Sequence, residues 1–251
     1  MPLLAIVRIE SDPAAATQAI ASLAKCTAYD ARMRLAAGLP AVVARIDAVV
    51  AATAVETLAA SKVGAVVVDD PIPSRSNRLC AQTIGLGAGV VKYTSRSGES
   101  RLMKDEEIWL ILRGVRSSSS TTKTTEKVAR PAMKGGVRTE SVSKSSTKEQ
   151  LENLVLIYTG DGACIEIAEQ EMQWTSLGDK RQLSGPANVT WIAGELQRRA
   201  PKARYDDSLV QLGRRTLPFV GASESASKVD RSDTVDVIAA VLHRACVLGL
   251  L

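Results

Sequence analysis

The chain has 251 residues, a formal net charge of +5 and 45% hydrophobic residues, so it is long and apolar enough to bury one large core or two ordinary ones. Its four cysteines form no CxxC pair and it has a single histidine, which argues against a zinc site of the Cys/His type. No apolar run approaches the roughly 18 residues that span a membrane, and no charged and apolar leader opens the chain. We therefore expect a cytoplasmic protein without a membrane span.

Residues 1–70 predict a small module with the element order β-α-α-β-α-β. Residues 3–9 are apolar and β-branched, which favours a strand. The alanine-rich segment that follows begins at Ser11 or Asp12, either of which can cap a helix, with Pro13 at a position where a missing N–H is harmless. The remaining predicted elements are a short helix over 27–38, a strand over 39–46, a helix over 47–62 and a strand over 63–70.

The segment TAYDARMRLAAGLPAVV, over 27–43, resembles part of a known family. A short helix, a break, a proline and a strand follow one another there, as they do in the C-terminal domain of the bacterial ribosomal stalk protein, whose fold is similar to the Clp protease adaptor. Thr27 and Ala28 stand where that family has a glycine-rich turn. Alanines occupy the first helix where lysines would be expected: Ala14, Ala15, Ala16, Ala19 and Ala21. The resemblance, which covers about residues 3–70, therefore implies the fold and not the ribosomal function.

The second half predicts an antiparallel β-rich domain over 81–215, joined to the module by a linker over 71–80. The linker begins with PIPSRSN, in which two prolines favour an extended polar chain, so we expect residues 1–72 to fold alone. Strands are predicted over 83–94, 100–105 and 107–116, and the continuous apolar run in the last of these is typical of a central strand.

Residues 117–150 are rich in serine, threonine and lysine and have no apolar periodicity. Such a segment buries too little apolar area to offset the entropy of ordering its backbone, so the simplest interpretation is a long disordered loop. Alternatively, its serines and threonines could extend the strands on either side. Seven lysines and arginines against three glutamates give the segment a net charge of 7 − 3 = +4, so it holds most of the basic excess.

Residues 152–169 predict a hairpin, because the turn sequence TGDG separates an apolar run from the alternating ACIEIAE. A strand over 172–178 and an amphipathic helix over 187–200 follow. A linker and a C-terminal helix complete residues 216–251. The order of elements over 81–215 resembles a pleckstrin-homology-like barrel. The whole chain is therefore expected to be α+β, with the small module followed by a barrel-like β domain and C-terminal helices.

Three features that could indicate chemistry have simpler explanations. The glycines over 85–89 lead into a strand rather than opening a helix, so we interpret them as strand glycines and not as a phosphate loop. His243 lies between apolar turns of the last helix and is interpreted as a half-buried helix residue rather than a general base. Adjacent acids at 69–70, 106–107 and 206–207 diverge on a strand or a helix, so they form no acid–base dyad. We assign no catalytic residue, no metal ligand and no cofactor.

Two candidate binding surfaces remain. An aromatic and two arginines on the second helix are residue types enriched in interface hot spots; the simpler alternative, which we prefer, packs the tyrosine internally and leaves the arginines solvated. The basic segment could contact nucleic acid or anionic lipid, although a solvated segment is the preferred interpretation. The candidate binding residues are Tyr29, Arg32, Arg34, Lys123, Lys127, Arg130, Lys134 and Arg138.

These observations favour a non-enzymatic adaptor or scaffold that acts through contacts with a protein partner. The alternative is a nucleic-acid- or ribosome-associated protein that uses the stalk-like module and the basic segment. An enzyme with an unfamiliar site is the third hypothesis. Loss of nucleic-acid binding with salt separates the first two hypotheses.

Overall fold

The computed structural model describes residues 1–69, 72, 75–131, 137–215, 217, 223–225, 228–230 and 232–251, and within these the side chains outside 118–148 and 223–232. The structure confirms the predicted α+β class. A three-stranded sheet and a nine-stranded sheet are present in the described part of the chain. No helix in that part is both long and apolar enough to cross a bilayer.

The N-terminal module has the predicted β-α-α-β-α-β order. Its elements are β1 (Leu3–Ile9), α1 (Pro13–Ala24), α2 (Ala28–Leu35), β2 (Ala41–Arg45), α3 (Ala48–Ala60) and β3 (Val63–Val68). The strands are antiparallel and lie in the order β2-β1-β3. Asp12 caps α1 by accepting hydrogen bonds from two backbone amides, and Thr27 and Asp30 form a capping box at the start of α2.

Both faces of the module's sheet are buried. Alternate residues such as Leu4, Ile6 and Val43 face the helices of the module. Their neighbours Leu3 and Val42 face the other way. That second face packs against the C-terminal helix α6 (Ser232–Val247). The module therefore shares a core with the end of the chain, and its sheet is not covered by residues 1–70 alone.

The larger body is built on a long mixed sheet. Its strands are β4 (Leu79–Gly87), β5 (Val90–Ser95), β6 (Ser100–Lys104), β7 (Ile108–Pro131), β8 (Val137–Thr159), β9 (Cys164–Ala168), β10 (Arg204–Asp206), β11 (Ser223–Ser225) and β12 (Lys228–Asp230). They follow the order β11-β12-β7-β8-β9-β4-β5-β6, with β10 beside β7. Two pairs, β4 with β9 and β7 with β10, are parallel. The described strands form an open path that includes parallel pairs, so the domain is β-rich as predicted, but no closed barrel and no purely antiparallel sheet is found among them.

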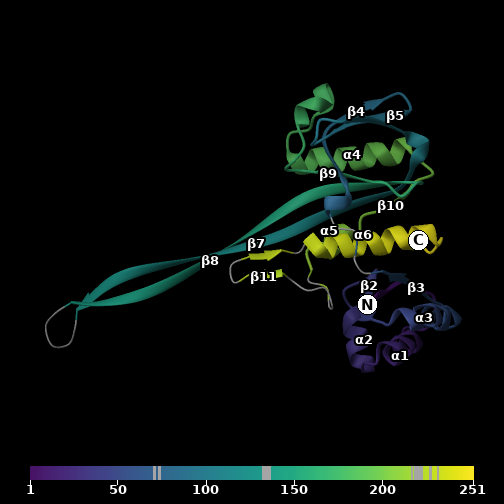
Figure 1. Cartoon of the computed structure of the whole chain (residues 1–251), viewed down its shortest axis with the longest axis horizontal. Coiled ribbons are helices and arrows are strands. Elements are labelled where there is room, and N and C mark those ends of the chain that lie inside the picture. Colours follow the sequence, from purple (N-terminus) through teal and green to yellow (C-terminus); the bar gives the residue numbers. More distant parts are fainter. Residues whose placement is uncertain are drawn as a thin grey trace.

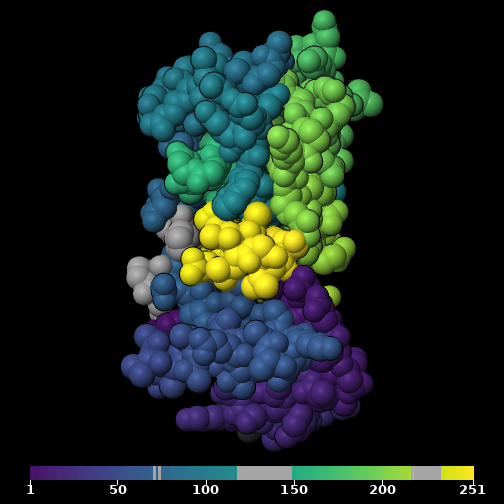
Figure 2. Space-filling view, turned by 90° about the vertical axis from the view of Figure 1, so that its right-hand side faces the viewer, coloured from purple at the N-terminus to yellow at the C-terminus, as the bar shows by residue number. Residues whose placement is uncertain are grey.

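The central strands β7 and β8 are apolar on both faces, as their continuous hydrophobic runs require. On one face Ile111, Val155 and Ile157 pack against the helix α4 (Gly185–Arg199). On the opposite face, side chains such as Leu110 and Leu156 pack against α6. Figure 1 shows the resulting layers: α4, the large sheet, α6, the small sheet and the helices of the module. Helix α6 is thus the shared layer between the two bodies, which Figure 2 shows from the side (yellow).

The short helix α5 (Leu209–Leu212) lies directly on β7 at Gly114. A Cβ atom at Gly114 would come 2.9 Å from the Cβ atom of Leu209, which is closer than side chains pack. Gly114 therefore allows the close approach of α5 and the burial of Leu209 and Leu212.

Two local predictions were wrong. Residues 172–178 do not form a strand, because Trp174–Lys180 is a 3₁₀ helix interrupted at Gly178, where φ is +55°. Residues 83–94 are two strands rather than one, since β4 ends at Gly87 and the chain turns through Gly89, which has a positive φ. In both places glycine sets the local geometry, and the flanking apolar residues suggested a longer strand than the backbone forms.

The segment 117–150, predicted to be a loop, is largely an extension of β7 and β8. The two strands pair in continuous register from Ser117 opposite Leu151 to Pro131 opposite Val137. Serine and threonine have a fair β-propensity, so the alternative interpretation of this segment holds for its backbone. The pair projects from the body as a long twisted ribbon (Figure 1).

Candidate functional site

We call the paired residues 121–131 and 137–147 the ribbon. At roughly 3.3 Å per residue, strands of this length extend about 35 Å. Beyond the body, β12 pairs with β7 only at Ser118–Ser120. Within the described chain, the ribbon strands then pair only with each other. The outer edge of each ribbon strand therefore carries backbone groups that no other described strand pairs.

Four of the five predicted basic residues lie on the ribbon. Lys123, Lys127 and Arg130 lie on β7 and Arg138 lies on β8, with side chains outside the described part, while Lys134 lies outside the described residues altogether. The sequence between 121 and 147 contains six lysines and arginines and two glutamates, so the net charge of this stretch of sequence is 6 − 2 = +4. This stretch therefore holds most of the chain's formal charge of +5.

The second predicted surface lies on α2 and is far from the ribbon (Figure 1). Tyr29 is 68% exposed, so the internal packing that we preferred for it is wrong. Met33, four residues later on the same helix face, is 56% exposed. Arg32 is also exposed, whereas Arg34 reaches back to donate a hydrogen bond to the carbonyl oxygen of Val43. The structure does not bring these residues together with the basic segment.

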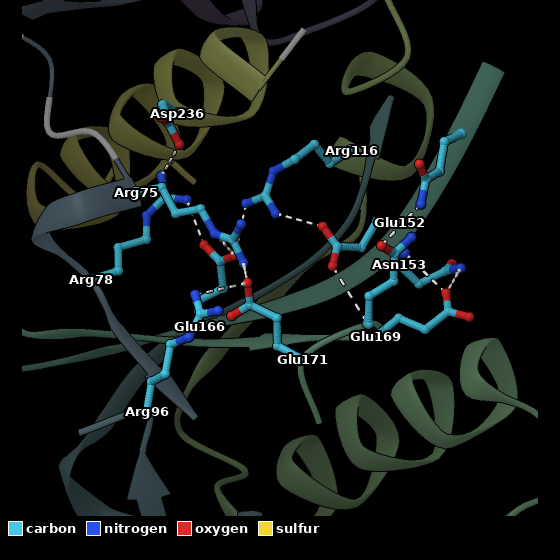
Figure 3. A network of polar contacts seen from close by, with 12 residues as sticks. Arg75, Arg78, Arg96, Arg116, Glu152, Asn153, Glu166, Glu169, Glu171 and Asp236 are labelled. Atoms are coloured by element: carbon cyan, nitrogen blue, oxygen red, sulfur yellow. Dashed lines mark hydrogen bonds and ion pairs between the residues drawn. The ribbon is translucent and has the colours of Figure 1, made fainter. Parts of the chain in front are cut away.

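A buried network of charges, which the sequence did not suggest, joins the strands β7, β8 and β9 to the segment before β4 and to α6 (Figure 3). Its centre is Glu166 on β9, whose side chain is completely buried. One carboxylate oxygen of Glu166 lies 2.8 Å from both Arg75 and Arg116, and the other accepts a hydrogen bond of 3.0 Å from Arg78. Arg78 also contacts Asp236 on α6 at 2.6 Å. The network thus ties four distant parts of the chain together.

Three further charges complete this network. Glu152 on β8 accepts a hydrogen bond of 2.8 Å from Arg116, and Glu171 lies 2.7 Å from Arg75. Arg96, which is largely exposed, lies 4.0 Å from Glu171. Four arginines and four carboxylates are therefore associated, so their formal charges cancel.

The pKa of Glu166 follows from these contacts. Burial alone would raise the pKa of its carboxyl, but the nearby charges of Arg116 and Arg75 and the hydrogen bonds from Arg116 and Arg78 outweigh burial. The pKa of Glu166 is consequently below its usual value, and the group is ionised at neutral pH. A carboxylate that stays ionised beside three arginines stabilises the fold, but it is poorly suited to donating or accepting a proton.

The sequence could have indicated part of this network. Arg116 and Glu166 are charged residues inside strands that are otherwise apolar, and such charges need a partner when both faces of a strand are buried. Arg75 and Arg78 gave no such signal, because they lie in a segment that had the composition of a linker. Elsewhere in the described chain, no group of three His, Cys, Asp or Glu side chains is placed to hold a metal ion.

Comparisons with known proteins give no relatives: no protein-family model, no curated protein and no solved structure matches the chain. The stalk-like and pleckstrin-homology-like resemblances therefore stay predictions. The ribbon and the exposed face of α2 are therefore the two candidate contact surfaces.

Proposed function

We propose that the protein is a non-enzymatic adaptor or scaffold, and that the ribbon is the element through which it contacts a protein partner. The observation that supports this proposal is the pairing of the ribbon strands with each other alone over residues 121–131 and 137–147. A two-stranded hairpin in water is marginally stable without a third strand or a covering helix. Contact with another molecule would supply the third strand or the covering surface that the rest of the described chain does not provide.

The chemistry of a strand edge favours a protein as that molecule. An unpaired edge presents N–H and C=O groups at regular spacing, and an extended peptide segment can satisfy them by adding a strand. The ribbon is rich in serine and threonine, which are compatible with strand pairing and do not form an apolar core of their own. The exposed Tyr29 and Met33 on α2 provide a second, smaller protein contact.

Nucleic acid is the alternative partner, and the net charge of +4 between residues 121 and 147 favours it. A two-stranded β-ribbon fits the major groove of DNA, and lysines and arginines would neutralise phosphates. Against this alternative, residues 121–147 contain no aromatic side chain on which a base could stack.

The test uses the full chain and two variants. In the first variant, Asn-Gly replaces residues 121–147, which joins the cross-strand partners Ser120 and Lys148 through a two-residue hairpin turn. In the second, the six lysines and arginines between 121 and 147 become serine, which keeps the length and β-propensity of the ribbon. The full chain is used as bait in nuclease-treated extract of the source cells, and each protein that it captures is purified and measured again for direct binding.

The adaptor proposal expects direct binding that the serine variant and high salt largely preserve and that the Asn-Gly variant loses. The same three proteins are titrated separately with purified RNA and DNA, and binding that falls steeply with salt and disappears in the serine variant would support the nucleic-acid alternative instead. Equal binding by the full chain and the Asn-Gly variant would contradict any role for the ribbon. Denaturant unfolding of all three proteins checks that the body is intact.

A further inference from the structure

A cavity of about 540 Å³ opens where the N-terminal module, the larger body and α6 meet. Its apolar wall comes from the end of β3, the start of β4, the β8–β9 turn and α6, through Val67, Leu79, Ala163 and Ala240. Figure 2 shows these parts of the chain converging around α6 (yellow). Cavities of this size at the junction of domains, with apolar walls and a few polar groups, are the usual setting of small-molecule sites.

Two stacked rings line the cavity. The imidazole of His243 on α6 lies against the phenol ring of Tyr158 on β8, with 4.5 Å between the ring centroids and 15° between the ring planes. Tyr158 is only 7% exposed, whereas His243 is half-buried. No side chain or backbone group in the described chain forms a hydrogen bond with the ring nitrogens of His243. His243 is thus the more exposed ring of the stack, and it offers the cavity a flat polar ring.

Four charged side chains also line the cavity, and two of them neutralise each other. Arg78 and Asp236 are paired at 2.6 Å, and both side chains are more than nine-tenths buried. The other two, Arg244 and Asp69, are exposed. In the part of the chain that the structure describes, neither has an ion-pair partner.

The pKa of His243 is lowered by two causes. Burial lowers the pKa of this imidazole and the neighbouring positive charge of Arg244 lowers it further. Of the two acids that line the same cavity, Asp236 is paired with Arg78 and Asp69 is exposed. Since burial and Arg244 both disfavour protonation, His243 is neutral at pH 7 and presents one donor and one acceptor nitrogen. A negative group placed beside the imidazole would be attracted by Arg244.

We propose that this cavity binds a small planar aromatic anion, with its ring stacked on His243 and its negative group held by Arg244. An aromatic carboxylate is the simplest member of this class, because the planar guanidinium of arginine matches a carboxylate through two parallel hydrogen bonds. The apolar wall would enclose the ring, and the ring nitrogens of His243 would bind a polar edge. This site is independent of the ribbon.

The single histidine of the chain makes a direct test possible, since the Hε1 NMR signal of His243 is the only one of its kind. The full-length protein is titrated with three probes: benzoate, which is planar and negative, cyclohexanecarboxylate, which is negative but not planar, and benzamidine, which is planar and positive. We expect a saturable shift of the His243 signal with benzoate, a binding constant at least about tenfold weaker for cyclohexanecarboxylate, and no saturable shift with benzamidine.

Two variants test whether benzoate binding depends on the charge of Arg244. Arg244→Gln should weaken benzoate binding about tenfold or more, because it removes a charge-assisted hydrogen bond. Arg198→Gln is the matched control: this arginine is also exposed, with 71% of its side chain accessible, but it lies on α4 away from the cavity, so binding should be unchanged.

Three outcomes would overturn the proposal. The absence of a saturable shift with benzoate would show that the cavity is no such site. Equal binding of cyclohexanecarboxylate would eliminate ring stacking, and tighter binding of benzamidine would show that Asp69 rather than Arg244 sets the preferred charge. Benzoate binding by the Asn-Gly ribbon variant should match that of the full chain, so failure of the adaptor proposal and failure of this one are distinguishable.

Discussion

The guanidinium of Arg78 bridges two carboxylates, at 3.0 Å from Glu166 on β9 and at 2.6 Å from Asp236 on α6. Arg78 stands immediately before β4, in a segment that has the composition of a linker. This contact fixes the C-terminal helix to the large sheet. The same helix covers the sheet of the N-terminal module, so α6 joins the two bodies through an apolar core and is tied to the large sheet by the two ion pairs of Arg78.

Removing the charge at the centre of the network should destabilise the protein strongly. Glu166→Gln leaves three arginines around a neutral group, and breaking a buried ion pair in this way costs about 3–5 kcal/mol. Denaturant unfolding at neutral pH measures the loss. Glu195→Gln is the control: its partner Arg198 has a side chain 71% exposed, so solvent screens the pair and the substitution should change stability little.

The difference in stability between wild type and Glu166→Gln should depend on pH, and the direction of that dependence follows from the pKa of Glu166. The pKa of Glu166 is lowered in the folded state from its ordinary value of 4.5. Its contribution to stability is therefore fully present above pH 4.5 and is lost as the pH falls through the lower pKa of the folded state. The gap in stability between wild type and Glu166→Gln should narrow as the pH falls below 4.5. A gap that is constant with pH would show that the ionised carboxylate is not the stabilising species.

The core that α6 shares with both sheets should make the two bodies unfold together. Leu242 on α6 is 1% exposed within this core, so Leu242→Ala should cost about 2–5 kcal/mol. Leu248, just beyond the helix, is 49% exposed, and its replacement by alanine should change stability by no more than about 0.5 kcal/mol.

Hydrogen exchange in Leu242→Ala reports which strands and helices lose stability. We expect faster exchange in β1 and β3 of the module as well as in β7 and β8. Residues 1–72 alone would expose the apolar face of the module's sheet, including Leu3 and Val66, and should give poorly dispersed amide NMR signals. A well-dispersed spectrum of this fragment would instead support the independent module that the sequence predicted.

How far the sequence predicts the structure depends on the range of the interactions. The module and the central strands follow from local patterns, because alternating residues such as Leu110 and Ile111 occupy opposite faces of one strand. The sequence of the ribbon favours a loop, because its serines and threonines do not alternate with apolar residues and therefore show no strand periodicity. The partners of Arg78 and the stacking of His243 on Tyr158 could not be predicted, because they join segments that are distant in the chain and carry no motif.

The ribbon should be the first site of proteolysis. Its two strands lack a third strand or a helix in the described chain beyond Ser120, and such a pair opens readily. Limited trypsin treatment should cleave within 121–147 before it cleaves the body. The two fragments should stay associated under native conditions, because β7 and β8 are paired within the large sheet on both sides of the cut. If a purified partner makes the ribbon resistant to trypsin, the partner contacts the ribbon. If the ribbon of the isolated protein is already resistant, the ribbon is protected without a partner and this prediction is wrong.

The titration of His243 tests the environment of the cavity without any ligand. Burial, the larger cause, and the adjacent charge of Arg244 both lower the pKa of this imidazole from its ordinary value of 6.5. Because the unfolded chain takes up this proton at a higher pH than the folded chain does, the stabilisation associated with His243 is present above pH 6.5 and is lost as the pH falls through the folded-state pKa. An NMR titration of the Hε1 signal should give a pKa below 6.5 in the wild type. Arg244→Gln should raise that pKa but leave it below 6.5, since burial remains, and Arg198→Gln should leave it unchanged. A wild-type pKa at or above 6.5 would mean that the imidazole is solvated or faces an acidic group. Its ring would then not be the half-buried surface beside Arg244 on which the proposed ligand stacks.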